Sequence, residues 1–192
     1  MTSFVRQAAL VRQYSPQKVL FGIRHAVGWH NVVYDPAGMH GYSEFPDTSL
    51  TTEGMRQAAV AIAPKVDFVF VSPLMRTLQT ANIMYPDTPQ IALEYLKEYP
   101  PEENIDNRRP ETSLLRRLFP TVDFSDLTDE RQPWPNPVDV DESVKRVKEI
   151  VMGAKATRFA VVTHSTWLKY WMTGTCNAES ELIHCHPYKL IF

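Results

Sequence analysis

Residues 19–26 read VLFGIRHA, an apolar run that ends on Arg24, His25 and Ala26. Such a run predicts a buried strand, and the carboxyl end of a strand is where α/β proteins place reactive groups. An imidazole there can attack phosphorus, and the adjacent guanidinium can hold the phosphoryl oxygens. An arginine beside a histidine is also common on protein surfaces, so a catalytic interpretation depends on partners elsewhere in the chain.

Two further runs predict strands, at residues 66–71 and 160–163, and a shorter one lies at 91–93. Helical patterns separate these runs. The alternation of strands and helices is typical of α/β proteins, so we expect a mostly parallel sheet.

Three helices are expected between the strands. One begins near Thr51, whose hydroxyl can cap it, and ends by Ala63. A second follows Ser72-Pro73 and runs to about Met84. A third spans about residues 142–152, with Gly153 as its stop.

Length and composition favour one domain over residues 1–192, because 192 residues with 44% hydrophobic content suffice for one core. A net charge of -2 gives no general field for polyanions, so nucleic acid is not an expected partner.

No apolar stretch approaches the roughly 20 residues of a membrane helix. Two cysteines and no cleavable apolar segment before the first strand favour a cytoplasmic protein.

Residues 99–137 contain many of the 15 prolines and cannot form one regular element. Leucines and phenylalanines between 114 and 124 favour a packed lid with a short helix over disorder. We therefore expect an inserted lid at about 99–137.

Three strand ends supply polar groups to one edge of the predicted sheet. Arg76 lies about one turn into the helix after the second strand, and His164 follows the strand at 160–163. Together with Arg24 and His25 they form the convergence that an active site in an open sheet requires.

These segments resemble the motifs of the histidine phosphatase superfamily, in the branch named for cofactor-dependent phosphoglycerate mutase. The matching motifs lie, in the family's order, at 24–31, 50–54, 72–77 and 161–165. Residues 24–31, 106–109 and 118–125 further resemble small phosphoglycerate mutase-like proteins of plants and fungi. The resemblance implies a three-layer α/β/α sandwich with a mostly parallel central sheet. Ala26 and Thr166 depart from the family, which usually has glycine at both positions.

The resemblance implies roles for the site residues. His25 is the expected nucleophile, which receives the phosphoryl group as a phosphohistidine. Arg24, Asn31 and Arg76 are expected to bind the phosphate oxygens, and His164 to stabilise charge during transfer. Because these side chains supply positive charge, no metal and no cofactor are expected.

A proton donor for the leaving group is also needed, and Glu98 is the preferred candidate. It follows the strand at 91–93, and its spacing before residues 106–109 resembles the family's acid position. Glu94 is the competing candidate, and it lies farther from the lid.

Several other residues have two interpretations. Arg108 and Arg109 either recognise a second anionic group on the substrate or belong to the solvated surface. His30 either helps to bind phosphate or packs against Trp29. The cluster of Cys176 and residues 184–186 contains possible zinc ligands, but the spacing fits no closed site, and a final strand is the favoured interpretation.

The expected function is hydrolysis of a small phosphomonoester through phosphohistidine. A phosphoglycerate mutase-type transfer uses the same intermediate and is the nearest alternative. A binding or scaffold protein without turnover is a third, and it is disfavoured because all five principal site residues are present.

Overall fold

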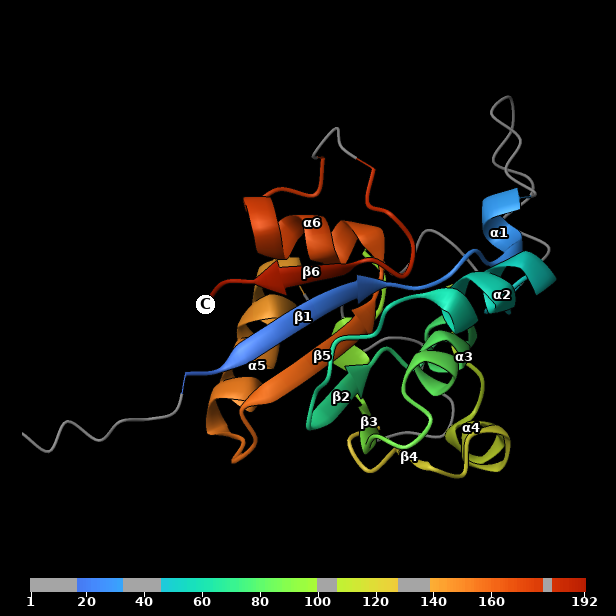
Figure 1. Ribbon diagram of the computed structural model, residues 1–192, viewed down its shortest axis with the longest axis horizontal. Coiled ribbons are helices and arrows are strands. Elements are labelled where there is room, and N and C mark those ends of the chain that lie inside the picture. The colour runs from blue at the N-terminus through green and yellow to red at the C-terminus, as the bar shows by residue number, and fades with distance from the viewer. Residues whose placement is uncertain (1–16, 33–45, 100–106, 128–138, 178–180) are drawn as a thin grey trace, which may run out of the picture.

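The computed structural model describes residues 17–32, 46–99, 107–127, 139–177 and 181–192 (Figure 1). Its strands are β1 Val19–Arg24, β2 Phe68–Val71, β3 Gln90–Ala92, β4 Val122–Asp123, β5 Arg158–Thr163 and β6 Pro187–Leu190. Its helices are α1 Trp29–Val32, α2 Thr52–Val60, α3 Met75–Met84, α4 Thr112–Leu118, α5 Val140–Gly153 and α6 Ser165–Thr173, with a 3₁₀ helix η2 at Glu94–Leu96. None of the helices in these ranges is long and apolar enough to cross a membrane.

The strands form one sheet in the order β4-β3-β2-β5-β1-β6. The first five are parallel to one another, and β6 pairs antiparallel with β1. In the central pair, Arg24 of β1 lies opposite Thr163 of β5. Strands β1 and β5 therefore end at the same level, and the residues that follow them lie side by side. The predicted mostly parallel sheet is confirmed.

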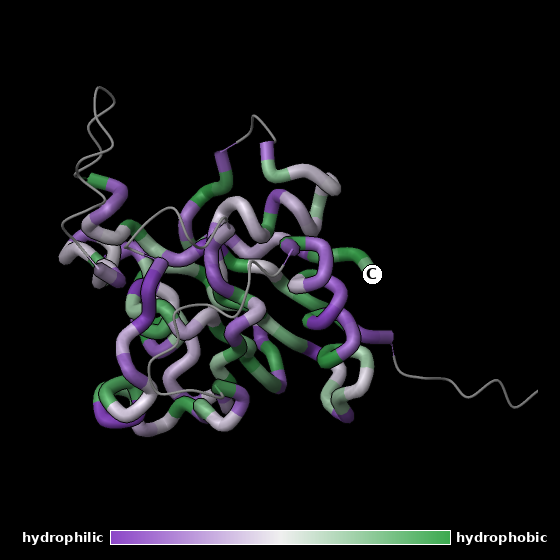
Figure 2. The backbone as a smooth tube through the Cα atoms, turned by 180° about the vertical axis from the view of Figure 1, so that it is seen from behind, coloured by the Kyte–Doolittle hydropathy of each residue, from purple (hydrophilic) through white to green (hydrophobic). Residues whose placement is uncertain are grey.

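Helices cover both faces of the sheet, which confirms the three-layer arrangement (Figure 1). Because strand side chains alternate between faces, each strand contributes to two cores. The core beneath α2 and α3 includes Ile23, Val71, Ala58, Leu78, Ala81 and Val162. The core beneath α5 and α6 includes Leu20, Phe70, Val147, Val161, Trp167 and Leu168. Hydrophobic stretches accordingly run through the centre of the molecule in Figure 2.

Helix α2 begins as predicted, because the Thr51 hydroxyl accepts a hydrogen bond from Gly54 N at 2.9 Å. The helix ends at Val60 and not at Ala63, since Ala61 is already extended, with ψ 143°. Helix α5 is longer than predicted at both ends. It starts at Val140, where Asp139 caps it, and it includes Gly153.

The helix predicted to follow Ser72-Pro73 is confirmed as α3, which begins at Met75 because Leu74 is extended. Its cap comes from outside the helix: Asp47 Oδ1 accepts a hydrogen bond from Met75 N at 2.8 Å. Further along the helix, Gln79 Oε1 accepts from Leu50 N at 2.8 Å. These bonds fasten the segment before α2 to the helix that carries Arg76.

The predicted lid at 99–137 lies partly outside the described residues, which omit 100–106 and 128–138. Its described part contains the expected short helix, α4, and the two-residue strand β4. Strand β4 pairs with β3 at the edge of the sheet. Residues 107–127 are therefore anchored to the main sheet.

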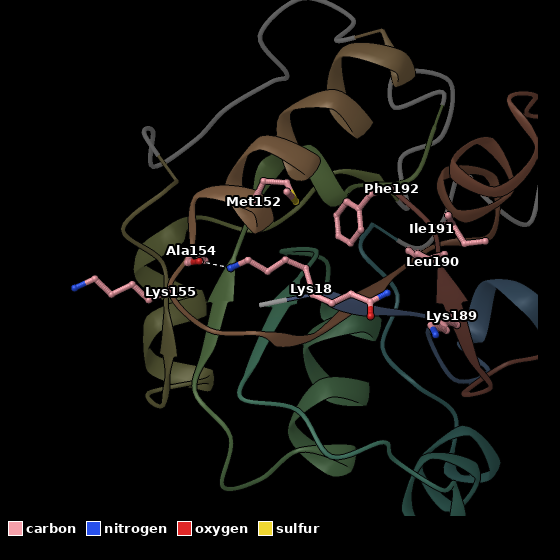
Figure 3. A pocket seen from close by; sticks show the side chains of 9 residues that line it. Lys18, Met152, Ala154, Lys155, Lys189, Leu190, Ile191 and Phe192 are labelled. Carbon is pink, nitrogen blue, oxygen red and sulfur yellow. Dashed lines mark hydrogen bonds between the residues drawn. The ribbon is translucent and has the colours of Figure 1, made fainter. Parts of the chain in front are cut away.

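A cavity of about 860 Å³ lies beside the residues that precede β1 and end β6 (Figure 3). Its lining includes Lys18, which precedes β1, and Leu190, which ends β6. Lys18 Nζ donates to the carbonyls of Ala154 and Ala156. This cavity is therefore separated from the groups at the carboxyl ends of β1 and β5 by the length of those strands.

The close approach of α2 to the segment after His25 gives a test of the fold. A Cβ on Gly54 would lie 2.0 Å from the carbonyl oxygen of Val27, which is rigid backbone. We expect Gly54→Ala to lower the free energy of unfolding by about 2–3 kcal/mol in urea denaturation. Gly153→Ala is the matched control, because nothing lies within 4 Å of the added methyl group. Equal stabilities of the two variants would contradict this packing.

Candidate active site

The shared end of β1 and β5 brings His25 and His164 together. Both residues directly follow their strands, and their ring centroids are 5.2 Å apart. Arg76 arrives from the first turn of α3, and its charge acts on both histidines. Arg24, the last residue of β1, completes the cluster that the sequence predicted at this edge.

The backbone around His25 is held by hydrogen bonds from three other segments. Arg24 O accepts from Cys185 N at 2.9 Å, and His25 N donates to Thr163 O at 3.0 Å. Ala26 N donates to the Thr80 hydroxyl on α3 at 3.0 Å. The position of the histidine is thus fixed before any ligand binds.

The hydrogen bond of the His25 ring determines which of its nitrogens is free. Nδ1 lies 2.7 Å from the carbonyl oxygen of Ala26, which can only accept. Nδ1 therefore carries the proton, and Nε2 carries the lone pair. Burial, followed by the charges of Arg76, His164 and His30, holds the pKa of His25 well below its usual range. The ring is neutral at physiological pH, as a nucleophile requires.

His164 is buried beside His25, and one of its ring nitrogens has no hydrogen-bond partner among the described residues. Its Nε2 lies 2.9 Å from the hydroxyl of Ser72, the residue that follows β2. Its Nδ1 has no hydrogen-bond partner among the described residues. Burial and the charge of Arg76 hold the pKa of His164 well below its usual range. The orphaned nitrogen is available to a ligand in this cluster.

Two buried guanidinium groups supply the positive charge. Arg24 Nη1 donates to Leu182 O at 2.7 Å and pairs at 3.3 Å with the exposed Glu181. Arg76 is 1% exposed, and its Nη2 donates to Asn107 Oδ1 at 2.7 Å. Fixed, buried cations interact with an anion more strongly than solvated ones, because less water screens them.

Glu98 lies between η2 and the first turn of α6. One carboxylate oxygen accepts from Tyr99 N at 3.0 Å and from Thr166 N at 3.2 Å. Burial raises the pKa of Glu98, and these hydrogen bonds and the charge of Arg76 oppose the rise in part. A carboxyl group with a raised pKa, next to the helix that starts after His164, has the properties of a proton donor.

Glu94, the competing acid, is occupied by two cations. Its carboxylate pairs with Lys97 Nζ at 2.7 Å and with Arg109 Nε. Arg109 is buried and also donates to Pro110 O at 3.0 Å and to the Thr112 hydroxyl at 3.2 Å. Glu94 and Arg109 are thus placed as a structural ion pair, while Arg108 is exposed.

The structure places Asn31 and His30 in a way that the motif did not indicate. Asn31 Oδ1 accepts from Gly28 N at 3.0 Å, a local bond at the start of α1.

His30 is buried, and its ring centroid lies 5.3 Å from that of His25. Burial, then the charge of Arg76, lowers the pKa of His30 to about 2. Trp29, the expected packing partner, is 47% exposed.

His184 is a second histidine that sequence reasoning left outside the site. The final strand was predicted to include it, but β6 begins only at Pro187, and Cys185 adopts a left-handed conformation with φ 58°. The ring of His184 lies 5.5 Å from that of His25. In the part of the chain that the structure describes, no three potential ligands are grouped as a metal site requires.

Comparison with known proteins supports one family. Residues 28–189 match the sequence model of the histidine phosphatase superfamily, branch 1. This range starts after His25, so the position of His25 rests on the geometry described above. A phosphoglycerate mutase-like protein of Arabidopsis thaliana is 29% identical, over 79% of this chain and 72% of its own. A phosphomutase-like protein 3 of Candida albicans is 28% identical, over 62% of this chain and 45% of its own.

A solved structure has the same fold. The phosphoserine phosphatase from Entamoeba histolytica, crystallised with 3-phosphoglyceric acid, superimposes with a TM-score of 0.57. The match covers 92% of this chain and 91% of that one, at 19% sequence identity. At that identity the likeness concerns the fold alone.

The lowered pKa values of the buried histidines predict how stability changes with pH. Below about pH 6.5 the histidines of the unfolded chain become protonated. In the folded protein His25, His30 and His164 stay neutral, because burial lowers their pKa values. The free energy of unfolding should therefore fall as pH drops from 7 to 5.5. Each of these histidines contributes up to about 1.4 kcal/mol per pH unit. Glu98 opposes this trend, because its raised pKa lets the folded protein bind a proton there more readily than the unfolded chain does. Its effect on the slope is at most that of one proton.

Urea denaturation at several pH values measures this slope. His164→Gln should reduce the slope of unfolding free energy against pH by an amount that corresponds to at most one bound proton. His186→Gln, at an exposed position, serves as the matched control. Stability that stays constant or rises from pH 7 to 5.5 would be inconsistent with neutral, buried histidines.

Proposed function

The chain belongs to branch 1 of the histidine phosphatase superfamily, and on that basis we propose that it hydrolyses a small phosphomonoester through a phosphohistidine on His25. The observation that carries the proposal is the hydrogen bond from His25 Nδ1 to Ala26 O. It leaves Nε2 as a neutral nucleophile in the same cluster as the buried guanidinium groups of Arg24 and Arg76.

In the first step the Nε2 lone pair of His25 attacks phosphorus, and the bond from phosphorus to the leaving oxygen breaks. Arg24, Arg76 and His164 stabilise the charge on the transferring phosphoryl group. The proton of Glu98 passes to the leaving oxygen, so an alcohol departs. The products of this step are phosphohistidine and the Glu98 carboxylate.

In the second step the Glu98 carboxylate takes a proton from water, and the resulting hydroxide attacks the phosphohistidine. The bond between phosphorus and Nε2 breaks, which releases inorganic phosphate and restores neutral His25. Glu98 ends protonated, as it began. Since Arg24 and Arg76 provide the positive charge, the cycle needs no metal ion.

Recognition of the rest of the substrate is assigned in this proposal to the lid at residues 99–137. Asn107, in its described part, bonds to Arg76, so this segment reaches the phosphate site. Arg108 is exposed beside it and can meet a second anionic group. Arg109 is buried and paired with Glu94, so this proposal gives Arg108 the larger part in that contact. Asn31 Oδ1 accepts from Gly28 N, and its amide nitrogen is proposed to donate to the phosphate oxygens.

A mutase reaction is the second candidate, because the Arabidopsis relative is named phosphoglycerate mutase-like. A mutase would return the phosphoryl group from His25 to a second hydroxyl on the substrate. Incubation with phosphoglycerates separates the two activities. A phosphatase releases inorganic phosphate, whereas a mutase interconverts the isomers.

Replacement of the nucleophile tests the chemistry. The protein should hydrolyse p-nitrophenyl phosphate in the presence of a metal chelator, and His25→Ala should lower kcat/KM at least about a thousandfold. His186→Ala, at an exposed histidine, is the matched control and should retain activity. Full activity of His25→Ala, or activity lost in the chelator, would refute the mechanism.

Replacement of the acid should depend on the leaving group. Glu98→Gln should slow the first step about a hundredfold or more for alkyl phosphates, because an alkoxide must be protonated as it leaves. Nitrophenolate leaves without a proton, so p-nitrophenyl phosphate should give a burst of nitrophenol and then slow turnover. Rapid-mixing absorbance measures both phases, with exposed Glu142→Gln as control. Equal losses in the rate of the first step for both substrate types would exclude Glu98 as the acid.

A further inference from the structure

We propose that His184 is a positioning residue, whose Nδ1–H holds the His25 carbonyl and thereby keeps Nε2 of His25 as the attacking nitrogen. The inference rests on the proposed function of His25. His184 Nδ1 lies 2.5 Å from the carbonyl oxygen of His25, which can only accept. His184 therefore donates from Nδ1.

The segment 181–185 holds both residues of the Arg24-His25 pair. Leu182 O accepts from the guanidinium of Arg24, and Cys185 N donates to the backbone carbonyl of Arg24. A bridge pairs Arg24 with His184 in parallel register. The side chain of His184 then reaches the next carbonyl, that of His25. Two successive carbonyls of the nucleophile segment are thus fixed from one side.

The His184 bond acts on the nucleophile through one peptide group. The oxygen of the peptide that joins His25 and Ala26 is held by His184, and its nitrogen is held by Thr80. The next carbonyl, Ala26 O, accepts from His25 Nδ1 and so sets the tautomer. Without the His184 donor this peptide can rotate about its neighbours, and Ala26 O loses its alignment with Nδ1.

The backbone turn at Cys185 lets the side chain of His184 reach the carbonyl oxygen of His25. Cys185 is 3% exposed and has φ 58°, a left-handed conformation that is unfavourable for a non-glycine residue. This turn separates His184 from β6, so its side chain does not follow the alternation of the strand. Burial and the charge of Arg24 lower the pKa of His184, which favours the neutral form of its ring.

Two variants separate the donor from the ring. In His184→Asn the amide nitrogen lies as many bonds from Cα as Nδ1 of histidine, so the donor is retained and the ring is lost. In His184→Phe the ring is retained and the donor is lost. We expect His184→Phe to lower kcat about tenfold with KM changed less than twofold, and His184→Asn to keep at least half of kcat. His186→Phe controls for an added phenylalanine in this region.

Nitrogen-15 NMR of the imidazoles gives a readout that does not depend on turnover. His25 should be protonated at Nδ1 in the wild-type protein and in His184→Asn, and should show a mixture of both tautomers in His184→Phe. If the wild-type protein releases no phosphate but shows this pattern, the proposed function fails and the positioning role stands.

Other results would overturn the positioning role. These are equal kcat values for the Phe and Asn variants, a loss confined to KM, or an unchanged His25 tautomer in His184→Phe. If His184→Phe does not fold, His184→Gln replaces it. The amide nitrogen of glutamine lies one bond farther from Cα, so it should not reach the His25 carbonyl, and kcat should fall as in His184→Phe. A wild-type kcat in His184→Gln would also reject the proposal.

Discussion

The parallel pairing of β1 with β5 is the constraint on which the site depends. Its register sets Arg24 opposite Thr163, so the next residues, His25 and His164, leave neighbouring strands at the same level. Their rings are consequently 5.2 Å apart. Two cores on opposite faces of the sheet stabilise this pairing. The sheet therefore positions Arg24 and the two histidines, while α3 adds Arg76 and the segment after η2 adds Glu98.

Burial gives these groups their chemical character. Desolvation keeps His25 and His164 neutral while Arg24 and Arg76 remain charged, because a guanidinium does not lose its proton in proteins. The same effect raises the pKa of Glu98. The site thus combines neutral histidines, fixed cations and a carboxyl group whose pKa is raised. Two fixed cations beside neutral histidines favour an anionic ligand, as the proposed phosphoryl transfer requires.

The sequence predicted the elements whose signals are local. The run before Arg24, the Thr51 cap and the helix after Ser72-Pro73 are all visible within a few residues. Contacts between distant segments were not predictable in this way. His184 meets the carbonyl of His25 across 159 positions, and Asp47 caps α3 from 28 positions away. His30 and Asn31 are adjacent, and only the orientation of the short α1 decides which of them faces His25.

The central claim is that Nε2 of His25 forms a covalent bond to phosphorus during turnover. Rapid quenching of the enzyme under alkaline conditions, followed by peptide mass spectrometry and phosphorus-31 NMR, tests it directly. We expect an acid-labile phosphoryl group on His25, attached at Nε2, which forms and decays fast enough to lie on the catalytic pathway. A phosphoryl group at Nδ1 or on another residue, or steady phosphate release with no covalent adduct, would contradict it.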